Sequence, residues 1–177
     1  MRKFLTISAA VLLFPLCVFA QGGIPLLDKV PGHRVHFHYT YSLSQGSEDF
    51  SPVTDGDVTL EDNAYILKGL GLEVRSDGVT RWTLDAAGRE LLVETIQKED
   101  LFTNPALFIA SYKDYMDRIK VNAAGDDSLD LTLTLDNNTR ARFLLNGISF
   151  GDREGKSDFS LDEKSLTYRD YVVTDLR

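Results

Sequence analysis

The sequence predicts a mainly β (α+β) fold, in which a curved antiparallel sheet of about ten or eleven strands forms an incomplete barrel covered by one main helix. Three observations lead to this prediction. Large apolar residues recur two apart in many short segments, which places them on one face of a strand. Short turns separate these segments, so successive strands are expected to pair antiparallel. One central segment changes to helical spacing.

Residues 1–20 have the features of a secretory signal peptide. A positively charged start precedes an apolar stretch from Leu5 to Phe19, and Val18-Phe19-Ala20 fits a small-x-small type of cleavage site. We therefore expect cleavage after Ala20, a periplasmic location, and a single domain over residues 21–177. An uncleaved membrane anchor and a lipoprotein signal stay open as alternatives.

The chain is acidic, with a net charge of -8, and it becomes more acidic when Arg2 and Lys3 leave with the signal. This charge argues against nucleic acid as a partner and against electrostatic docking on anionic lipid headgroups. Cys17 is the only cysteine and also leaves. The mature protein is thus expected to have no disulfide, no thiolate metal site and no cysteine nucleophile.

After a lead-in loop, Arg34 to Tyr41 alternates regularly and predicts the first strand. Ser42 to Asp55 is polar and contains Pro52, so it is expected to be a connection. A meander of five short strands follows, with one apolar and one charged face. Its predicted strands are Asp57–Asp62, Ala64–Lys68, Leu72–Ser76, Val79–Leu84 and Arg89–Glu94.

Helical spacing appears between Glu99 and Asp117. Asn104 is a suitable N-cap and Pro105 suits the first turn of a helix. An apolar stripe along this helix is expected to cover the meander, with Trp82 packed beneath it. The stripe consists of Phe108, Tyr112, Tyr115 and Met116.

The strand pattern returns after Arg118. Ser128 to Asp136 and Thr139 to Leu145 alternate and predict a hairpin, in which Asp130 and Arg142 can pair across the outer face. One helix cannot cover so many one-sided strands, so the sheet is expected to curl. It then either packs shut or leaves an apolar cavity for a ligand. Further strands are expected at Ile148 and Phe150, at Phe159 and Leu161, and at Tyr171 and Val173.

Three patterns resemble catalytic or metal-binding motifs. Gly147-Ile-Ser149-Phe-Gly151 fits the hydrolase pattern G-x-S-x-G, but a loop follows it where a helix is needed, which favours a strand. His36 and His38 share a strand face and can bind a metal together with a neighbouring carboxylate. Two histidines on an exposed strand face are more often simply solvated. An acidic cluster lacks the spacing of a calcium loop, so it is expected to be a solvated turn. It comprises Asp55, Asp57, Glu61 and Asp62. We predict no enzyme, no metal and no cofactor.

The meander and the helix start resemble the LolA-like outer-membrane lipoprotein carriers. The resemblance covers about Gly56 to Met116, with a Ser76-Asp77-Gly78 turn, Trp82, and Asn104-Pro105 before the helix. It implies a periplasmic half-barrel whose hydrophobic cavity takes acyl chains. The amphipathic helix that opens such carriers does not fit into Gln21 to Arg34, so a reduced lid is expected.

We therefore expect a non-enzymatic carrier or chaperone for lipid or lipoprotein acyl chains. By the resemblance, its partners are inner- and outer-membrane lipoprotein-sorting components. An envelope structural or protein-interaction module with a filled barrel is the alternative. The candidate lining residues are Phe37, Tyr39, Leu67, Val74, Trp82, Leu84, Phe108, Tyr112, Leu131, Leu133 and Phe143.

Overall fold

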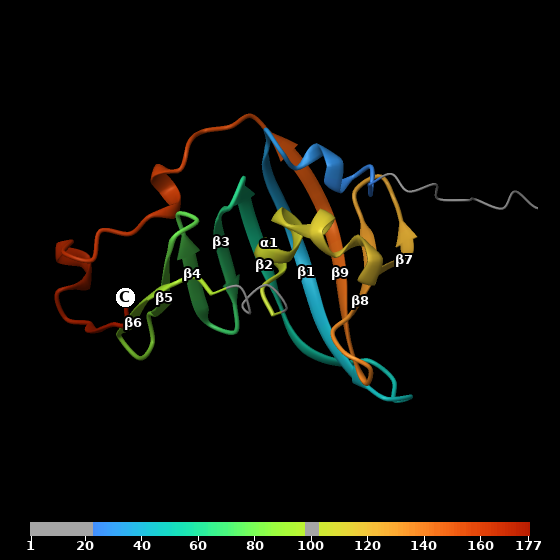
Figure 1. Cartoon of the computed structure of the whole chain (residues 1–177). Coiled ribbons are helices and arrows are strands. Elements are labelled where there is room, and N and C mark those ends of the chain that lie inside the picture. Colours follow the sequence, from blue (N-terminus) through green and yellow to red (C-terminus); the bar gives the residue numbers. More distant parts are fainter. Residues whose placement is uncertain (1–22, 98–102) are drawn as a thin grey trace, which may run out of the picture.

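A computed structural model describes residues 23–97 and 103–177, and the predicted signal peptide lies outside them. The described residues form ten strands, a short α-helix and several 3-10 turns (Figure 1). The strands are β1 Arg34–Gln45, β2 Ser51–Glu61, β3 Ala64–Gly69, β4 Leu72–Ser76, β5 Thr80–Asp85, β6 Glu90–Thr95, β7 Ile119–Ala124, β8 Leu129–Thr134, β9 Thr139–Gly151 and β10 Val172–Asp175.

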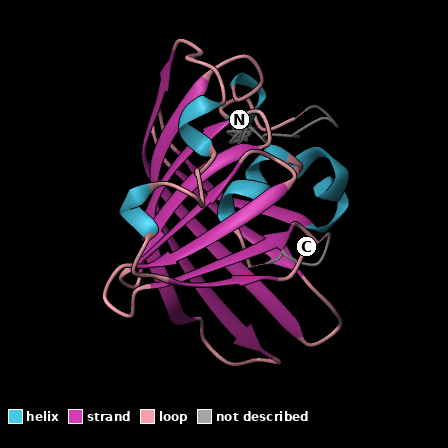
Figure 2. Ribbon diagram, turned by 90° about the vertical axis from the view of Figure 1, so that its left-hand side faces the viewer, coloured by secondary structure: helices cyan, strands magenta, loops and turns pink. Residues whose placement is uncertain are grey.

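All ten strands belong to one sheet in the order β10-β6-β5-β4-β3-β2-β1-β9-β8-β7. Neighbouring strands are antiparallel except β10, which runs parallel to β6. The sheet stays open (Figure 2). The strand order puts β10 and β7 at its two edges. The predicted fold class, a mainly β protein built on an unclosed antiparallel sheet, is confirmed.

The strand register defines two faces of the sheet. The helix-covered face carries Val35, Phe37, Tyr39 and Tyr41 of β1, all of which are buried. The outer face carries the alternate residues of the same strand, beginning with Arg34. The large hydrophobic core lies on the helix-covered face and joins β1, β2, β8 and β9 to the helix.

The expected connection from Ser42 to Asp55 is wrong over most of its length. β1 continues to Gln45 and β2 begins at Ser51, so the two strands form a long hairpin. The register shifts where Tyr41 pairs with Thr54 and Ser42 pairs with Pro52. Proline is tolerated at such an irregularity, which is why Pro52 did not end the strand.

A glycine bulge in β9 keeps its apolar residues on one face. Gly147 has a φ of +63°, and the register against β1 shifts at this point. Two residues of β9 then stand opposite one residue of β1, which reverses the alternation. Leu145 and Ile148 therefore both point into the core despite their odd spacing. The bulge also joins the predicted Ile148 and Phe150 strand to the preceding one.

The predicted helix is present but divided. α1 covers only Pro105–Ala110, and a 3-10 segment, η3, covers Tyr112–Arg118. Ser111 leaves the helical region with φ −117° and ψ 12°, and Tyr115 is non-helical inside η3. In Figure 1, α1 lies in front of the middle of the sheet.

In Figure 1 the chain after β9 runs around the margin of the sheet and ends in β10, which pairs with β6. Hydrogen bonds from Arg75 to the Asp158 carbonyl and from Trp82 to Glu163 place this segment on the outer face. We call residues 152–171 the C-terminal strap. The strand expected at Phe159 and Leu161 is wrong, because Ser157–Phe159 forms a 3-10 turn, η4. Both side chains are nevertheless buried against the sheet, which explains their apolar character. Within the described part of the chain, no helix has both the length and the apolar character needed to cross a membrane.

Candidate functional site

We call α1 and η3 the cover of the sheet. Nine of the eleven candidate lining residues lie on the helix-covered face or in this cover. One row of the sheet runs from Phe37 through Val58 and Leu67 to Val74, across four neighbouring strands. A second row joins Tyr41 to Phe143 and Leu131 on the other side of β1. Leu133 pairs with Ala141 in the next row. The structure thus brings these residues into one continuous apolar surface.

Trp82 and Leu84 lie on the opposite face, and the expectation that Trp82 packs beneath the helix is wrong. Trp82 pairs with Arg75 and Val93, which point outward. It packs under the C-terminal strap in a second hydrophobic cluster with Leu91, Val93 and Leu161. Its indole Nε1 donates a hydrogen bond to Glu163 at 2.8 Å. The alternation of β5 puts Trp82 and Leu84 on one face, but alternation within a strand does not show that this face lies opposite the one that carries Val74.

The cover begins at an N-cap that the sequence identified. The Asn104 side chain accepts hydrogen bonds from the backbone N–H groups of Ala106 and Leu107 at 3.0 and 3.3 Å. Phe108 projects from α1 onto the sheet and stacks on Phe143, with ring centroids 4.7 Å apart and planes 11° apart. Such an offset contact adds to the burial of both rings.

A polar contact, which we call the Asp28 clamp, ties the end of the cover to the N-terminal turn. The Tyr112 hydroxyl donates to Asp28 Oδ1 at 2.6 Å, and Lys113 Nζ lies 2.8 Å from the same oxygen. Burial and the neighbouring carboxylate raise the pKa of Tyr112 to about 12. The hydrogen bonds from Lys113 and Tyr112 lower the pKa of Asp28. The clamp therefore joins a carboxylate to a protonated phenol near neutral pH.

A small hollow of about 170 Å³ marks the place where the 3-10 turn η1 (Leu27–Lys29) meets α1 and η3. Leu27, Val30 and Ile109 supply its apolar lining, and Lys113 and Asp114 stand among its polar residues. The hollow lies beside the Asp28 clamp, because Tyr112 belongs to both. η1 and the cover thus meet along a seam, and the Asp28 clamp supplies the polar contacts across it.

The apolar side chains beneath the cover are completely buried, and those further along the sheet are only partly buried. Phe108, Leu131, Leu133 and Phe143 are fully buried. Leu67 and Val74 are only partly buried where the row reaches β3 and β4, although they pack against the same core. The face therefore extends further along the sheet than its tightly packed centre.

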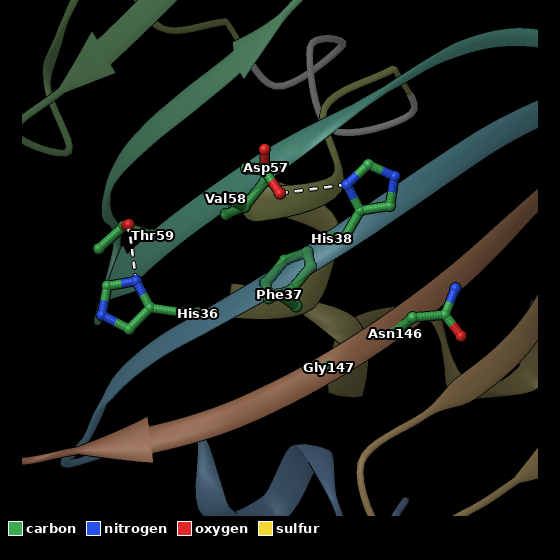
Figure 3. Close-up of a pocket in the computed structure, with 8 residues that line it drawn as sticks. All are labelled: His36, Phe37, His38, Asp57, Val58, Thr59, Asn146 and Gly147. Carbon is green, nitrogen blue, oxygen red and sulfur yellow. Dashed lines mark hydrogen bonds and ion pairs between the residues drawn. The ribbon is translucent and has the colours of Figure 1, made fainter.

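The outer face of β1 carries a shallow polar hollow of about 350 Å³ around the Gly147 bulge (Figure 3). His36 Nδ1 lies 2.9 Å from the Thr59 hydroxyl, and His38 Nδ1 lies 3.1 Å from Asp57. The two imidazoles turn to different partners, as Figure 3 shows. Among the described residues, no group of three or more histidine, cysteine or acidic side chains has the geometry to hold a metal.

Ser149, the centre of the G-x-S-x-G pattern, lies within β9 on the outer face, opposite His36 in the ladder. The preference for a strand over a nucleophile elbow is thus confirmed. The Asp130–Arg142 pair is also confirmed, with Arg142 Nη2 2.6 Å from Asp130 Oδ2.

The solvated-turn expectation is wrong for Glu61, which is fully buried. Its carboxylate receives Arg34 Nε at 3.1 Å, and Arg34 Nη1 also reaches Glu154 and Asp158 of the strap. We call this group the strap network. Sequence reasoning missed it because Arg34 and Glu61 meet only through the β1–β2 register. Its one sequence signal is a charged residue at the first position of an otherwise regular strand.

No protein-family model and no curated protein matches the sequence. Among solved structures, the chain is similar to a LolA superfamily protein from Nitrosomonas europaea, with a TM-score of 0.44 and 10% identity. The match covers 78% of this chain and 97% of that chain.

Proposed function

We propose that this protein is a non-enzymatic periplasmic carrier or chaperone that binds lipid or lipoprotein acyl chains on the helix-covered face. One observation carries the proposal: the apolar row from Phe37 to Val74 runs out from the buried core to partly exposed positions. Water-exposed apolar surface next to a packed core favours an apolar ligand. Each buried CH₂ group of an acyl chain contributes roughly 0.8 kcal/mol.

Access to the centre of the face requires the cover to move. Phe108 must leave Phe143, and the seam between η1 and η3 must open at the Asp28 clamp. α1 has only six residues, and isolated helices of that length are unstable in water. The cover therefore depends on its contacts with the sheet, and an acyl chain that offers equivalent apolar contacts can replace them.

The periplasmic location rests on the predicted signal peptide at residues 1–20. Secretion would place the carrier between the two membranes, where inner- and outer-membrane lipoprotein-sorting components are its proposed partners. Within the fold, the candidate lining becomes the nine residues on the helix-covered face and its cover. Trp82 and Leu84 instead belong to the cluster beneath the strap.

A second candidate function is supported by the filled interior. The complete burial of Leu131, Leu133 and Phe143 suits an envelope structural or protein-interaction module that takes no lipid. Such a module would keep its core closed and would use its surface to bind a protein partner.

Uptake of a fluorescent fatty acid by the secreted protein distinguishes the two candidates. We expect wild-type protein to take up the probe and Val74→Asp to lose uptake, because the carboxylate would face the acyl chain. Val79→Asp is the matched control, since Val79 is exposed on a turn. Circular dichroism verifies that both variants fold.

Native mass spectrometry of protein purified from the periplasm gives an independent result. A co-purified lipid supports the carrier. A ligand-free mass, together with wild-type protein that takes up no fatty acid, would overturn it and leave the interaction module.

A further inference from the structure

The outer face of β7, β8 and β9 holds a groove of about 340 Å³ with a strongly basic lining. Its walls include Lys120 of β7, Thr132 of β8, and Arg140 and Arg142 of β9, with Phe50 from the β1–β2 loop at one side. The volume lies within the range of small-molecule sites, roughly 300–1,000 Å³. We call it the basic groove. It lies on the face opposite the proposed acyl surface and does not depend on that proposal.

The sheet register aligns two of the cations on either side of a hydroxyl. Lys120 pairs with Thr132 in the β7–β8 ladder, and Thr132 pairs with Arg142 in the β8–β9 ladder. Adjacent strands are about 4.8 Å apart, so the three side chains form one row across the groove. A ligand above Thr132 therefore lies between the Lys120 side chain and the guanidinium of Arg142.

The single carboxylate in the lining is already neutralised. Asp130 accepts two hydrogen bonds from Arg142, at 2.6 and 2.9 Å, and a third from Asn122 Nδ2 at 3.0 Å. Arg142 and Asp130 thus cancel each other's charge. Lys120 and Arg140 supply the remaining charge of the groove, which is positive although the whole chain carries -8.

Arg140 is held in place by uncharged oxygens. Its Nη2 donates to the Ser44 hydroxyl at 2.8 Å and lies 3.4 Å from the Gly46 carbonyl. Its guanidinium carbon lies 5.2 Å from the centroid of the Phe50 ring. These contacts fix the side chain without neutralising it, so Arg140 keeps its positive charge where it lines the groove.

We infer that the basic groove binds the phosphate group of a small phosphorylated ligand. The planar guanidinium of Arg140 matches the oxygens of a phosphate, Lys120 adds a second positive charge, and the Thr132 hydroxyl adds a polar contact. The groove has room for a small polar group attached to the phosphate. A soluble phosphate ester and a glycerophosphate lipid headgroup share this chemistry.

Titration of the secreted protein with sodium phosphate and with glycerol 3-phosphate, followed by NMR, tests the inference. We expect amide shifts in β8 and β9, and a loss of affinity of about tenfold or more in the double variant Lys120→Ala/Arg140→Ala. Lys164→Ala/Arg169→Ala is the charge-matched control, because both residues are exposed in the strap. The control is expected to retain wild-type affinity.

Vesicle sedimentation identifies the source of the phosphate. Sedimentation with phosphatidylglycerol vesicles but not with phosphatidylcholine vesicles, lost in the groove variant, indicates a lipid headgroup. Binding of glycerol 3-phosphate without sedimentation indicates a soluble ester. Absence of phosphate binding, or an equal loss in groove and control variants, would overturn the inference.

Discussion

At the residue scale, the buried Arg34–Glu61 pair shows how the strap is held on the sheet. Burial alone would raise the pKa of Glu61, but hydrogen bonds from the Glu154 and Gly155 backbone N–H groups and from Arg34 outweigh it and lower the pKa. Glu61 therefore stays charged inside the protein. Its partners come from both ends of the chain, so the pair joins β1 and β2 to the strap.

Removal of the Glu61 carboxylate is expected to destabilise the protein strongly. Glu61→Ala leaves Arg34 buried with part of its neutralising charge gone, which costs about 3 kcal/mol of unfolding free energy. Urea unfolding followed by circular dichroism measures the loss. Asp57→Ala on the same strand is the control, because the exposed Asp57 side chain is expected to contribute no more than about 0.5 kcal/mol. Equal effects of the two variants would contradict the role given to the pair.

The Asp28 clamp predicts a loss of stability at high pH. The pKa of Tyr112 rises from 10.0 in the unfolded chain to about 12 in the fold, so folding favours the protonated phenol. Its contribution is complete below pH 10 and is lost as pH rises towards 12. The unfolding free energy of wild-type protein relative to Tyr112→Phe is therefore expected to be constant up to pH 10 and to fall above it. A constant difference up to pH 12 would show that the clamp does not perturb this group.

At the scale of elements, local sequence signals set where segments begin, and distant contacts set how they continue. Asn104 and Pro105 start α1 where the sequence predicts. The helix ends at Ser111, and Tyr112 then turns its hydroxyl to Asp28, a residue far away in the sequence. In β9 the bulge performs a similar adjustment, because it returns Ile148 to the core.

The β9 bulge is expected to require glycine at its centre. Gly147→Ala places a side chain at φ +63°, which costs roughly 1–2 kcal/mol. A Cβ there meets open space, so any loss reports backbone strain and not a clash. Gly151→Ala in the same strand is the control, since a Cβ at Gly151 has its nearest neighbour at 3.8 Å and the backbone does not have this positive φ. Thermal unfolding compares the two, and an unaffected Gly147→Ala would rule out the strain.

At the scale of the whole molecule, one sheet separates two hydrophobic clusters. α1, η1 and η3 cover the larger cluster on one face. The strap covers the smaller cluster, which contains Trp82, on the other face of β5 and β6. The parallel strand β10 then closes the strap against β6. The strap is thus part of the fold, held by charge at its start and by apolar contacts along its length.

Trp82 can report on the strap, since it is the only tryptophan. Leu161→Ala is expected to cost about 2–3 kcal/mol and to shift the Trp82 emission to longer wavelength, because Leu161 packs in the same cluster. Leu176→Ala is the control, because Leu176 is 64% exposed. Equilibrium unfolding and fluorescence spectra measure both effects. An unshifted spectrum in Leu161→Ala would place the indole away from the strap.

Much of the fold was predictable because its signals are local. Alternation in Arg34 to Tyr41 and in Ser128 to Leu145 identified strands, and the Asn104-Pro105 pair identified the helix start. The extension of β1 and β2 was missed because Pro52 usually ends a strand unless a bulge accommodates it. Of the candidate lining, nine residues were placed on one surface and two were not. Acyl binding by this surface stays a prediction.

Composition and apolar periodicity were enough to establish the class of fold, the alternation of the strands and the acidic, cysteine-poor character of the chain. The three-dimensional structure was needed to show which face Trp82 occupies, that Glu61 is buried, and that β10 pairs in parallel with β6. The physical reason is that alternation specifies two faces but does not specify what covers each of them. That choice depends on register and on contacts between residues far apart in the chain, such as Arg34 with Asp158 and Tyr112 with Asp28.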